Sequence, residues 1–413
     1  MGSVAYVFLW LFVFCVPWEG VIRISGVSIA SRATGAVALG IATLAVFITG
    51  RMRRWNVMHA AALLFILCAG LTLLLRTGNP KLPSKYYTFV QLFAVLWMIW
   101  QLAPTRRALY GLMFSYVLGS YAASVATILL YRSQGGLLRR FAVGGVDPND
   151  LAMTLALAVP MAWYLGTVYQ RPILRFVSRA YLPVGLLALG LTGSRGGMIV
   201  AFVSLAIVPL SMTKLTPGRL ATAMATLVLT GMLAAVYVPD KVVARLATTQ
   251  NEVESASFGG RFKLWVAGLE AFTQKPLMGY GTGGFVAAIT PKLGDRSLVA
   301  HNSYISVLVE EGIIGLLCYS IMLLSAVAAV RKLPHLERRF AQVLLVALFL
   351  AMSPLTWEDR KPVWLILGIV VGLSHAAMSP RSASPVSAAP LRPRPRLVRR
   401  ELLADADPTR TPL

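Results

Sequence analysis

The sequence is poor in charged side chains and in cysteine. Of its 413 residues, 13% are charged, 57% are apolar and three are cysteines. Such a low share of charge excludes an ordinary soluble globular protein. Cys15, Cys68 and Cys318 all lie in apolar stretches, which excludes an extracellular disulfide framework and a thiolate metal cluster. The composition therefore predicts an integral membrane protein.

Apolar runs long enough to cross about 30 Å of hydrocarbon as helices recur along the chain. They do not alternate apolar and polar residues, which excludes a membrane β-barrel. We expect an all-α protein with about 12 transmembrane helices and one long external loop. The expected spans are Val4–Trp18, Ile29–Gly50, Val57–Leu75, Tyr86–Ala103, Ala108–Tyr131, Asp150–Gln170, Ala180–Leu191, Gly196–Thr213, Leu220–Val238, Asn302–Val330, Arg339–Leu355 and Pro362–Met378.

Three segments follow from this pattern. Residues 1–378 form the polytopic membrane domain, and residues 239–300 form its long polar loop. Residues 379–413 are rich in Pro, Ser, Ala and Arg, a composition that predicts a disordered basic tail. The first span has no basic start and no cleavage pattern of small residues, so we expect it to be retained as a helix.

Lysine and arginine in the short loops set the orientation. Fourteen basic residues fall on the side that holds both termini, and eleven fall on the other side. Both termini are therefore expected in the cytoplasm, and the long loop outside. Since much of the net charge of +23 stays on the outer face, it cannot serve nucleic acid. An anionic lipid or a lipid-linked substrate is the expected partner.

Three residues are candidates for chemistry at the outer face. Arg195 lies in the turn LTGSRGG, where it either snorkels to headgroups or meets an anion. The glycines around it suggest a close approach of the backbone to a bulky group such as phosphate. Arg261 opens an amphipathic stretch with an apolar stripe of Phe262, Trp265, Leu269 and Phe272, which predicts an interfacial helix. His301 closes the polar loop, and it either acts as a base or merely caps a helix.

Other polar groups carry weaker expectations. The run GYGTGGF from Gly279 resembles a phosphate-binding loop only loosely and is expected to be a turn, either with or without amides that face a cavity. Glu310 and Glu311 lie within a span, where one pairs with an arginine or both lie near the interface. Two outer clusters either bind glycan or serve the fold: Asp147, Asn149 and Asp150, and Trp357, Glu358, Asp359, Arg360 and Lys361.

Five motifs in order carry a family resemblance. They are VDPNDLA, LTGSRGG, GGRFKLWVAGLEAFTQKPLMGYGTGGF, AHNSYISVLVEEGIIGL and WEDRKPVWLILG, over about residues 145–372. Together they resemble the bacterial O-antigen ligase and polymerase superfamily of membrane proteins. The resemblance implies a GT-C-like helical membrane fold, the bacterial inner membrane as location, and an active site at the periplasmic face.

The resemblance also implies an activity. It is the metal-independent, inverting transfer of a glycan from a polyprenyl (undecaprenyl) pyrophosphate carrier to an acceptor hydroxyl, with no cofactor. Arg195 and Arg261 would stabilise the pyrophosphate, and His301 would act as the base. Asn302, Glu311 and Arg360 are the expected further substrate contacts. The acceptor stays open between lipid A core, a growing chain and a protein hydroxyl. The main alternative is a transporter or flippase of lipid-linked oligosaccharides, and a membrane scaffold is a third.

Overall fold

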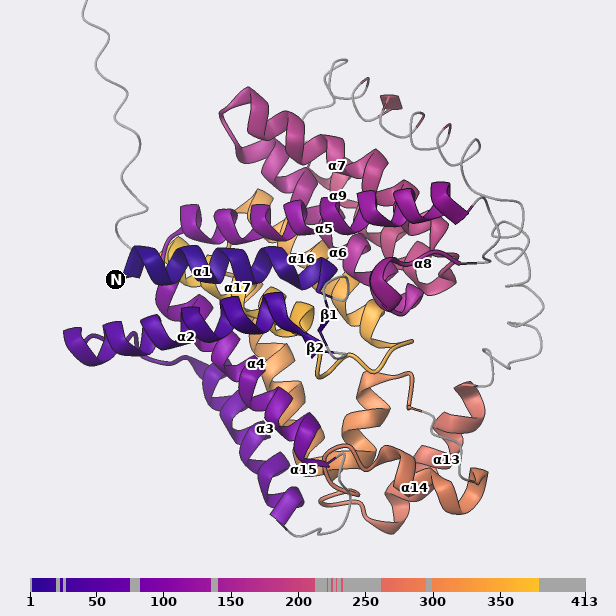
Figure 1. The fold of residues 1–413 in the computed structure, drawn as a ribbon. Helices are drawn as coiled ribbons and strands as arrows, with labels where there is room; N and C mark the ends of the chain where they lie inside the picture. The colour runs from indigo at the N-terminus through magenta and orange to yellow at the C-terminus, as the bar shows by residue number, and fades with distance from the viewer. Residues whose placement is uncertain are drawn as a thin grey trace, which may run out of the picture. The chain divides into compact units, whose positions relative to one another are not determined.

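Almost every described segment of the computed structural model is helical (Figure 1). The structure describes residues 2–19, 23–24, 27–74, 82–134, 140–211, 221, 224–225, 228, 232, 261–294 and 299–378. The α-helices are α1 (Gly2–Cys15), α2 (Ile29–Thr49), α3 (Val57–Leu74), α4 (Leu82–Leu102), α5 (Arg106–Gln134), α6 (Pro148–Val168), α7 (Pro172–Leu191), α8 (Arg195–Leu205), α9 (Ile207–Leu210), α13 (Arg261–Gln274), α14 (Phe285–Leu293), α15 (Ser303–Val330), α16 (His335–Met352) and α17 (Lys361–Met378). A short hairpin of β1 (Arg23–Ile24) and β2 (Val27–Ser28) precedes α2.

Each expected span that falls on described residues corresponds to a helix, so the all-helical prediction is confirmed for this part of the chain. Six of these helices are long and apolar enough to cross a membrane: α2, α5, α6, α7, α15 and α17. Shorter apolar helices cover Gly2–Trp18, Val57–Leu73 and Arg195–Leu210. The figure of about twelve spans stays a prediction. The expected span Leu220–Val238, much of the loop at 239–300 and the tail at 379–413 lie outside the described residues.

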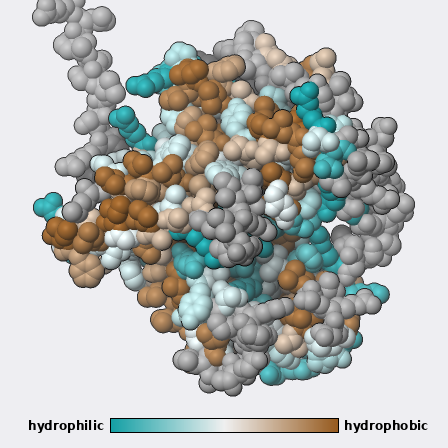
Figure 2. All heavy atoms as spheres, viewed as in Figure 1, coloured by the Kyte–Doolittle hydropathy of each residue, from teal (hydrophilic) through white to brown (hydrophobic). Residues whose placement is uncertain are grey.

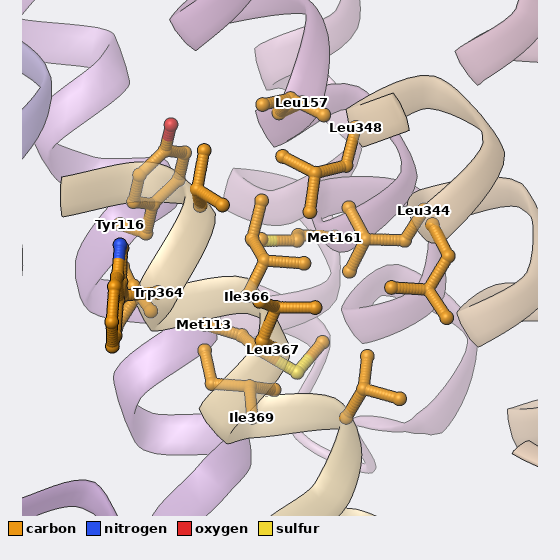
Figure 3. Close-up of a cluster of buried hydrophobic side chains, with 14 of the residues drawn as sticks. Met113, Tyr116, Leu157, Met161, Leu344, Leu348, Trp364, Ile366, Leu367 and Ile369 are labelled. Carbon is orange, nitrogen blue, oxygen red and sulfur yellow. The ribbon is translucent and has the colours of Figure 1, made fainter. Parts of the chain in front are cut away.

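The core of the helical bundle is apolar and involves α5, α6, α16 and α17. Figure 3 shows Met113 and Tyr116 of α5 close to Trp364 and Leu367 of α17, with Leu344 of α16 beyond them. Every one of these side chains is fully buried. Helix α6 is buried along almost its whole length, so it occupies the centre of the bundle. Its first residues carry polar groups that belong to the site described below.

Helix α15 is broken in the middle. Gly312 has φ of 67° and ψ of −167°, a backbone conformation open essentially only to glycine. The segment between α13 and α14 fills the break: Ile313 donates its N–H to Pro276 O at 2.8 Å, and Tyr280 donates to Val309 O at 2.8 Å. The loop thus supplies hydrogen-bond partners for backbone groups of α15 that the break leaves without a partner inside the helix. In an apolar environment such groups need a partner.

This docking decides between the two alternatives for the glycine-rich run. The amide of Gly281 donates to Glu310 O at 2.7 Å, and that of Gly283 donates to the Glu310 carboxylate at 2.8 Å. A Cβ at Gly279 would lie 2.5 Å from Glu310 O. The glycines therefore allow close packing against α15. The run forms the expected turn, the amides of Gly281 and Gly283 face α15 and not a cavity, and those of Gly279 and Gly284 bond within the loop.

A helix, α13, is present where an interfacial helix was expected, and small residues form much of its buried side. Leu264, Ala267 and Ala271 are buried and form a small apolar cluster with α14 and Val309 of α15. Phe262 and Leu269, from the expected stripe, are 50% and 45% exposed. The helix is rotated relative to the aromatic pattern because small residues, not the largest ones, allow its close contact with α14 and α15.

Candidate functional site

Arg195 is the first residue of α8 and follows a tight turn. Ser194 caps the helix by accepting the N–H of Gly197 at 3.2 Å. A Cβ at Gly197 would lie 2.4 Å from the Cβ of Ala152 on α6. This glycine therefore serves the contact between α6 and α8. The guanidinium of Arg195 is partly buried at this turn.

The start of α6 connects this turn to its surroundings. Asp147 caps α6, and its carboxylate accepts the N–H of Asn149 at 2.7 Å. The side-chain oxygen of Asn149 in turn accepts Arg140 Nη2 at 2.7 Å and Ser194 Oγ at 3.0 Å. The capping alternative for this cluster is thus confirmed for Asp147, while Asn149 joins the arginine-bearing turn to α6.

His301 has an unusual backbone and is held from both sides. With φ of 48°, it has the only positive φ of a non-glycine residue in the described part of the chain. Its N–H donates to Thr356 Oγ1 at 3.0 Å. The preceding carbonyl, of Ala300, accepts the indole N–H of Trp265 on α13 at 3.0 Å. Strained conformations of this kind persist where the surrounding structure holds them, and they are frequent at functional sites.

The charge environment of His301 includes two of the candidate groups. Burial lowers its pKa below the ordinary value of 6.5, the positive charge of Arg261 lowers the pKa further, and Asp147 opposes the shift. Arg261 is the first residue of α13 and is partly buried. The structure therefore brings Arg261, His301 and the cap of α6 into one electrostatic group, and it keeps the imidazole neutral at neutral pH.

Arg195 is linked to this group through its neighbours. Ser194 binds Asn149, two residues after Asp147. On its other side, a Cβ at Gly196 would lie 3.5 Å from Pro354, in the same loop that holds His301 through Thr356. A chain of contacts thus runs from the turn of Arg195 through the loop before α17 to His301, and from Ala300 to the helix α13 that Arg261 begins.

The loop between α16 and α17 packs mostly inward, so two residues of the cluster from Trp357 to Lys361 serve the fold. Trp357 and Glu358 are buried, and the Trp357 indole donates to Asp150 Oδ1 at 2.9 Å. Only Arg360 is largely exposed: its side chain is 53% exposed, and Nη2 lies 3.6 Å from Asp150 Oδ2.

A buried ionic cluster at the first half of α15 was not expected from the sequence. Lys85 Nζ lies 2.8 Å from Glu310 Oε2 and 2.6 Å from Glu358 Oε1. Ser306, one turn after His301, donates to Glu358 Oε1 at 2.7 Å. Burial raises the pKa of Glu358, and the ammonium of Lys85 opposes this. In the sequence, Lys85 is only one of several basic residues at span ends, so nothing there marks it as the partner of two carboxylates.

Two expected substrate contacts have structural partners at this end of the bundle. Glu311 accepts the hydroxyl of Thr282 at 2.6 Å and that of Thr72 at 3.0 Å, and it is 2% exposed. Asn302 caps α15 by accepting the N–H groups of Tyr304 and Ile305. Glu311 thus fastens α3 and the glycine-rich loop to the broken helix. Among the described residues, the ion pair of Glu310 is with Lys85, so a lysine takes the place of the arginine expected beside these carboxylates.

No curated protein matches this chain. Residues 180–320 match the family model described as O-antigen ligase. The matched segment contains Arg195, Arg261 and His301, together with the glycine-rich loop and the break in α15. Over this part the chain is therefore similar to the O-antigen ligase family, in agreement with the resemblance carried by its motifs.

Proposed function

We propose that this protein transfers a glycan from a polyprenyl pyrophosphate carrier to an acceptor hydroxyl at the periplasmic face of the bacterial inner membrane. The observation that carries the proposal is the grouping of Arg261 with His301, the one strained non-glycine residue of the described chain, inside the family-matched segment. O-antigen or exopolysaccharide ligation and polymerisation are both compatible with this site.

His301 is the proposed general base. Because its pKa is lowered, the imidazole is unprotonated at neutral pH and able to accept a proton. The acceptor hydroxyl gives its proton to this ring as its oxygen bonds to the anomeric carbon. The bond from that carbon to the pyrophosphate oxygen breaks at the same time, from the opposite face. The products are a glycoside of inverted configuration and the free polyprenyl pyrophosphate.

Arg195 and Arg261 are the proposed partners of the leaving group. Negative charge grows on the pyrophosphate as the glycosidic bond breaks, and guanidinium groups bind phosphate oxygens through paired, charge-assisted hydrogen bonds. Two arginines would supply the stabilisation that metal ions supply elsewhere, so the proposed mechanism is metal-independent and needs no cofactor.

The three proposed substrate contacts differ in their exposure and in the partners that they already have. Arg360 is exposed beside Asp150 and is available to a glycan or a phosphate. Asn302 and Glu311 already bind backbone amides and threonine hydroxyls, so their proposed contribution is to hold α15 and its preceding residues in place. The donor is a lipid-linked glycan, the acceptor is a glycan or lipid A core, and both termini lie in the cytoplasm.

The test uses cells that lack this gene and are rescued with wild type, His301→Ala or His335→Ala. His335 is an exposed residue at the start of α16 and serves as the control. Mass spectrometry of polyprenyl-pyrophosphate-linked glycans should show material that wild type and His335→Ala clear and His301→Ala does not. Accumulated single repeats indicate a polymerase, and finished chains indicate a ligase. Clearance by His301→Ala would overturn the proposed base.

One observation favours the transporter alternative. A broken helix beside buried ionisable groups, as in α15 with Lys85 and Glu310, is a feature of substrate and ion sites in transporters. A transporter would move intact lipid-linked glycan and would not join it to an acceptor. Purified protein that forms the glycoside from donor and acceptor in detergent, where no second compartment exists, excludes that alternative.

A further inference from the structure

A cavity of about 280 Å³ lies between α1, α2 and α4, with Lys361 of α17 at its edge. Its walls include Phe12, Leu39, Leu92 and Met98, so most of its lining is apolar. Helices α1 and α2 lie side by side here, and α4 packs against both (Figure 1).

The cavity is polar at one end. Helix α2 contributes Ser31 and Arg32 near its start and Leu39 two turns later, while α4 contributes Thr88 and Gln91 before Val95 and Met98. Seven residues of helix separate Arg32 from Leu39, a rise of about 10 Å. Polar groups therefore lie near the starts of α2 and α17 and in the first half of α4, and apolar walls lie further along α2 and α4.

The polar end carries one net positive charge. Lys361 forms an ion pair with Glu19 and donates to Ser31 Oγ at 3.0 Å, so its charge is compensated. Arg32 adds a further positive charge at the rim and is exposed. Since α2 and α17 begin at this end, their dipoles also favour an anion there.

The cavity opens at the surface of the bundle, because its lining residues Arg32, Ala36 and Gln91 are exposed. Within the candidate span of α2, only 11% of the residues are buried, although the span is apolar. Its exposed side chains include Val37, Leu44, Phe47 and Ile48, and Figure 2 shows hydrophobic surface over α1 and α2. A helix with this exposure faces hydrocarbon, so a lipid can enter beside it.

We propose that this cavity binds one anionic phospholipid, with an acyl chain between α1, α2 and α4 and its phosphodiester at Arg32. The order of polar and apolar groups matches that of a lipid, and a phosphodiester carries the single negative charge that the rim complements. A polyprenyl pyrophosphate carries more charge and would be better matched by two guanidiniums. This site does not depend on the proposed glycosyl transfer.

The first test measures bound lipid on the intact protein. Wild type in detergent is titrated with phosphatidylglycerol or with phosphatidylcholine of the same chains, and native mass spectrometry counts the lipids retained. We expect one tightly bound phosphatidylglycerol, and binding weakened by about tenfold in Arg32→Gln. Arg132→Gln, which removes an exposed charge at the end of α5, is the control and should bind as wild type does.

The second test fills the cavity from two sides. Ala36→Phe on α2 and Ala94→Phe on α4 place a ring among the lining residues, and both should prevent retention. Two positions are used because either variant alone could misfold, and the melting temperature identifies that case. The proposal is overturned if Arg32→Gln and a folded cavity variant retain lipid as wild type does. It is also overturned if the retained lipid is a polyprenyl phosphate.

Discussion

Lys85 and Glu358 are 273 residues apart in the sequence, yet Lys85 Nζ lies 2.6 Å from Glu358 Oε1 in the interior. The Glu358 side chain is fully buried, and that of Lys85 is 12% exposed. The pair joins the start of α4 to the loop before α17, and Glu310 adds the broken helix α15 to the same contact. The ammonium of Lys85 thus holds these three segments together.

Replacing Lys85 by Met should destabilise the protein strongly. Two buried carboxylates would lose their counter-charge, and breaking such a buried pair costs about 3–5 kcal/mol. The control is Lys292→Met: Lys292 pairs with Glu270, and both side chains are 51% exposed, so its loss costs less than about 1 kcal/mol. Thermal unfolding in detergent measures both. Equal melting temperatures for the two variants would contradict a stabilising role of the buried pair.

Gly312→Ala should disrupt the break in α15. The new Cβ would lie 2.2 Å from Leu277 O, at a φ of +67° that alanine rarely adopts. We expect a loss of about 2–3 kcal/mol, seen as a lowered melting temperature. Gly40→Ala in α2, where a Cβ meets nothing within 4 Å, should instead be neutral or stabilise by about 0.5–1 kcal/mol. A variant at Gly312 as stable as wild type would show that the loop does not require this conformation.

The pH dependence of transfer should report the pKa of His301. A base acts when it is unprotonated, so the rate should rise with pH through a pKa below 6.5 and level off above it. Removing the charge of Arg261 raises that pKa, so Arg261→Gln should move the rising limb to higher pH. Lys263→Gln, an exposed neighbour on α13, should leave it in place. Histidine NMR titration gives the same pKa independently of activity.

Thr356 should be a positioning residue for His301. Its hydroxyl accepts the His301 N–H at 3.0 Å, and Thr356→Val removes this acceptor with little change in volume. We expect the turnover to fall about tenfold with little change in KM, and Thr356→Ser to restore it. The chemical shift of the His301 amide should move in the valine variant alone. If valine and serine behave alike in both measurements, the contact does not position the base.

The helices could be predicted from the sequence because apolar runs and capping residues act locally. Asp147 caps α6, as the capping alternative for its cluster expected, and Asn302, the expected first residue of its span, caps α15 in place of His301. The surroundings of Glu310, Glu358 and the glycine-rich loop could not be predicted, since each is defined by a partner distant in sequence. Trp357 and Glu358 look like surface residues until Lys85 and Asp150 are placed against them.

The break at Gly312 changes how deeply α15 enters the bilayer. Residues 313–330 measure about 27 Å as a helix, which is close to the hydrocarbon thickness of about 30 Å. This half can cross the membrane alone, so the half from Ser303 to Glu311 can stand outside the hydrocarbon with α13 and α14 packed against it. In that arrangement Glu310 and Glu311 are buried by protein, beside Lys85, Thr282 and Thr72, and not by lipid tails.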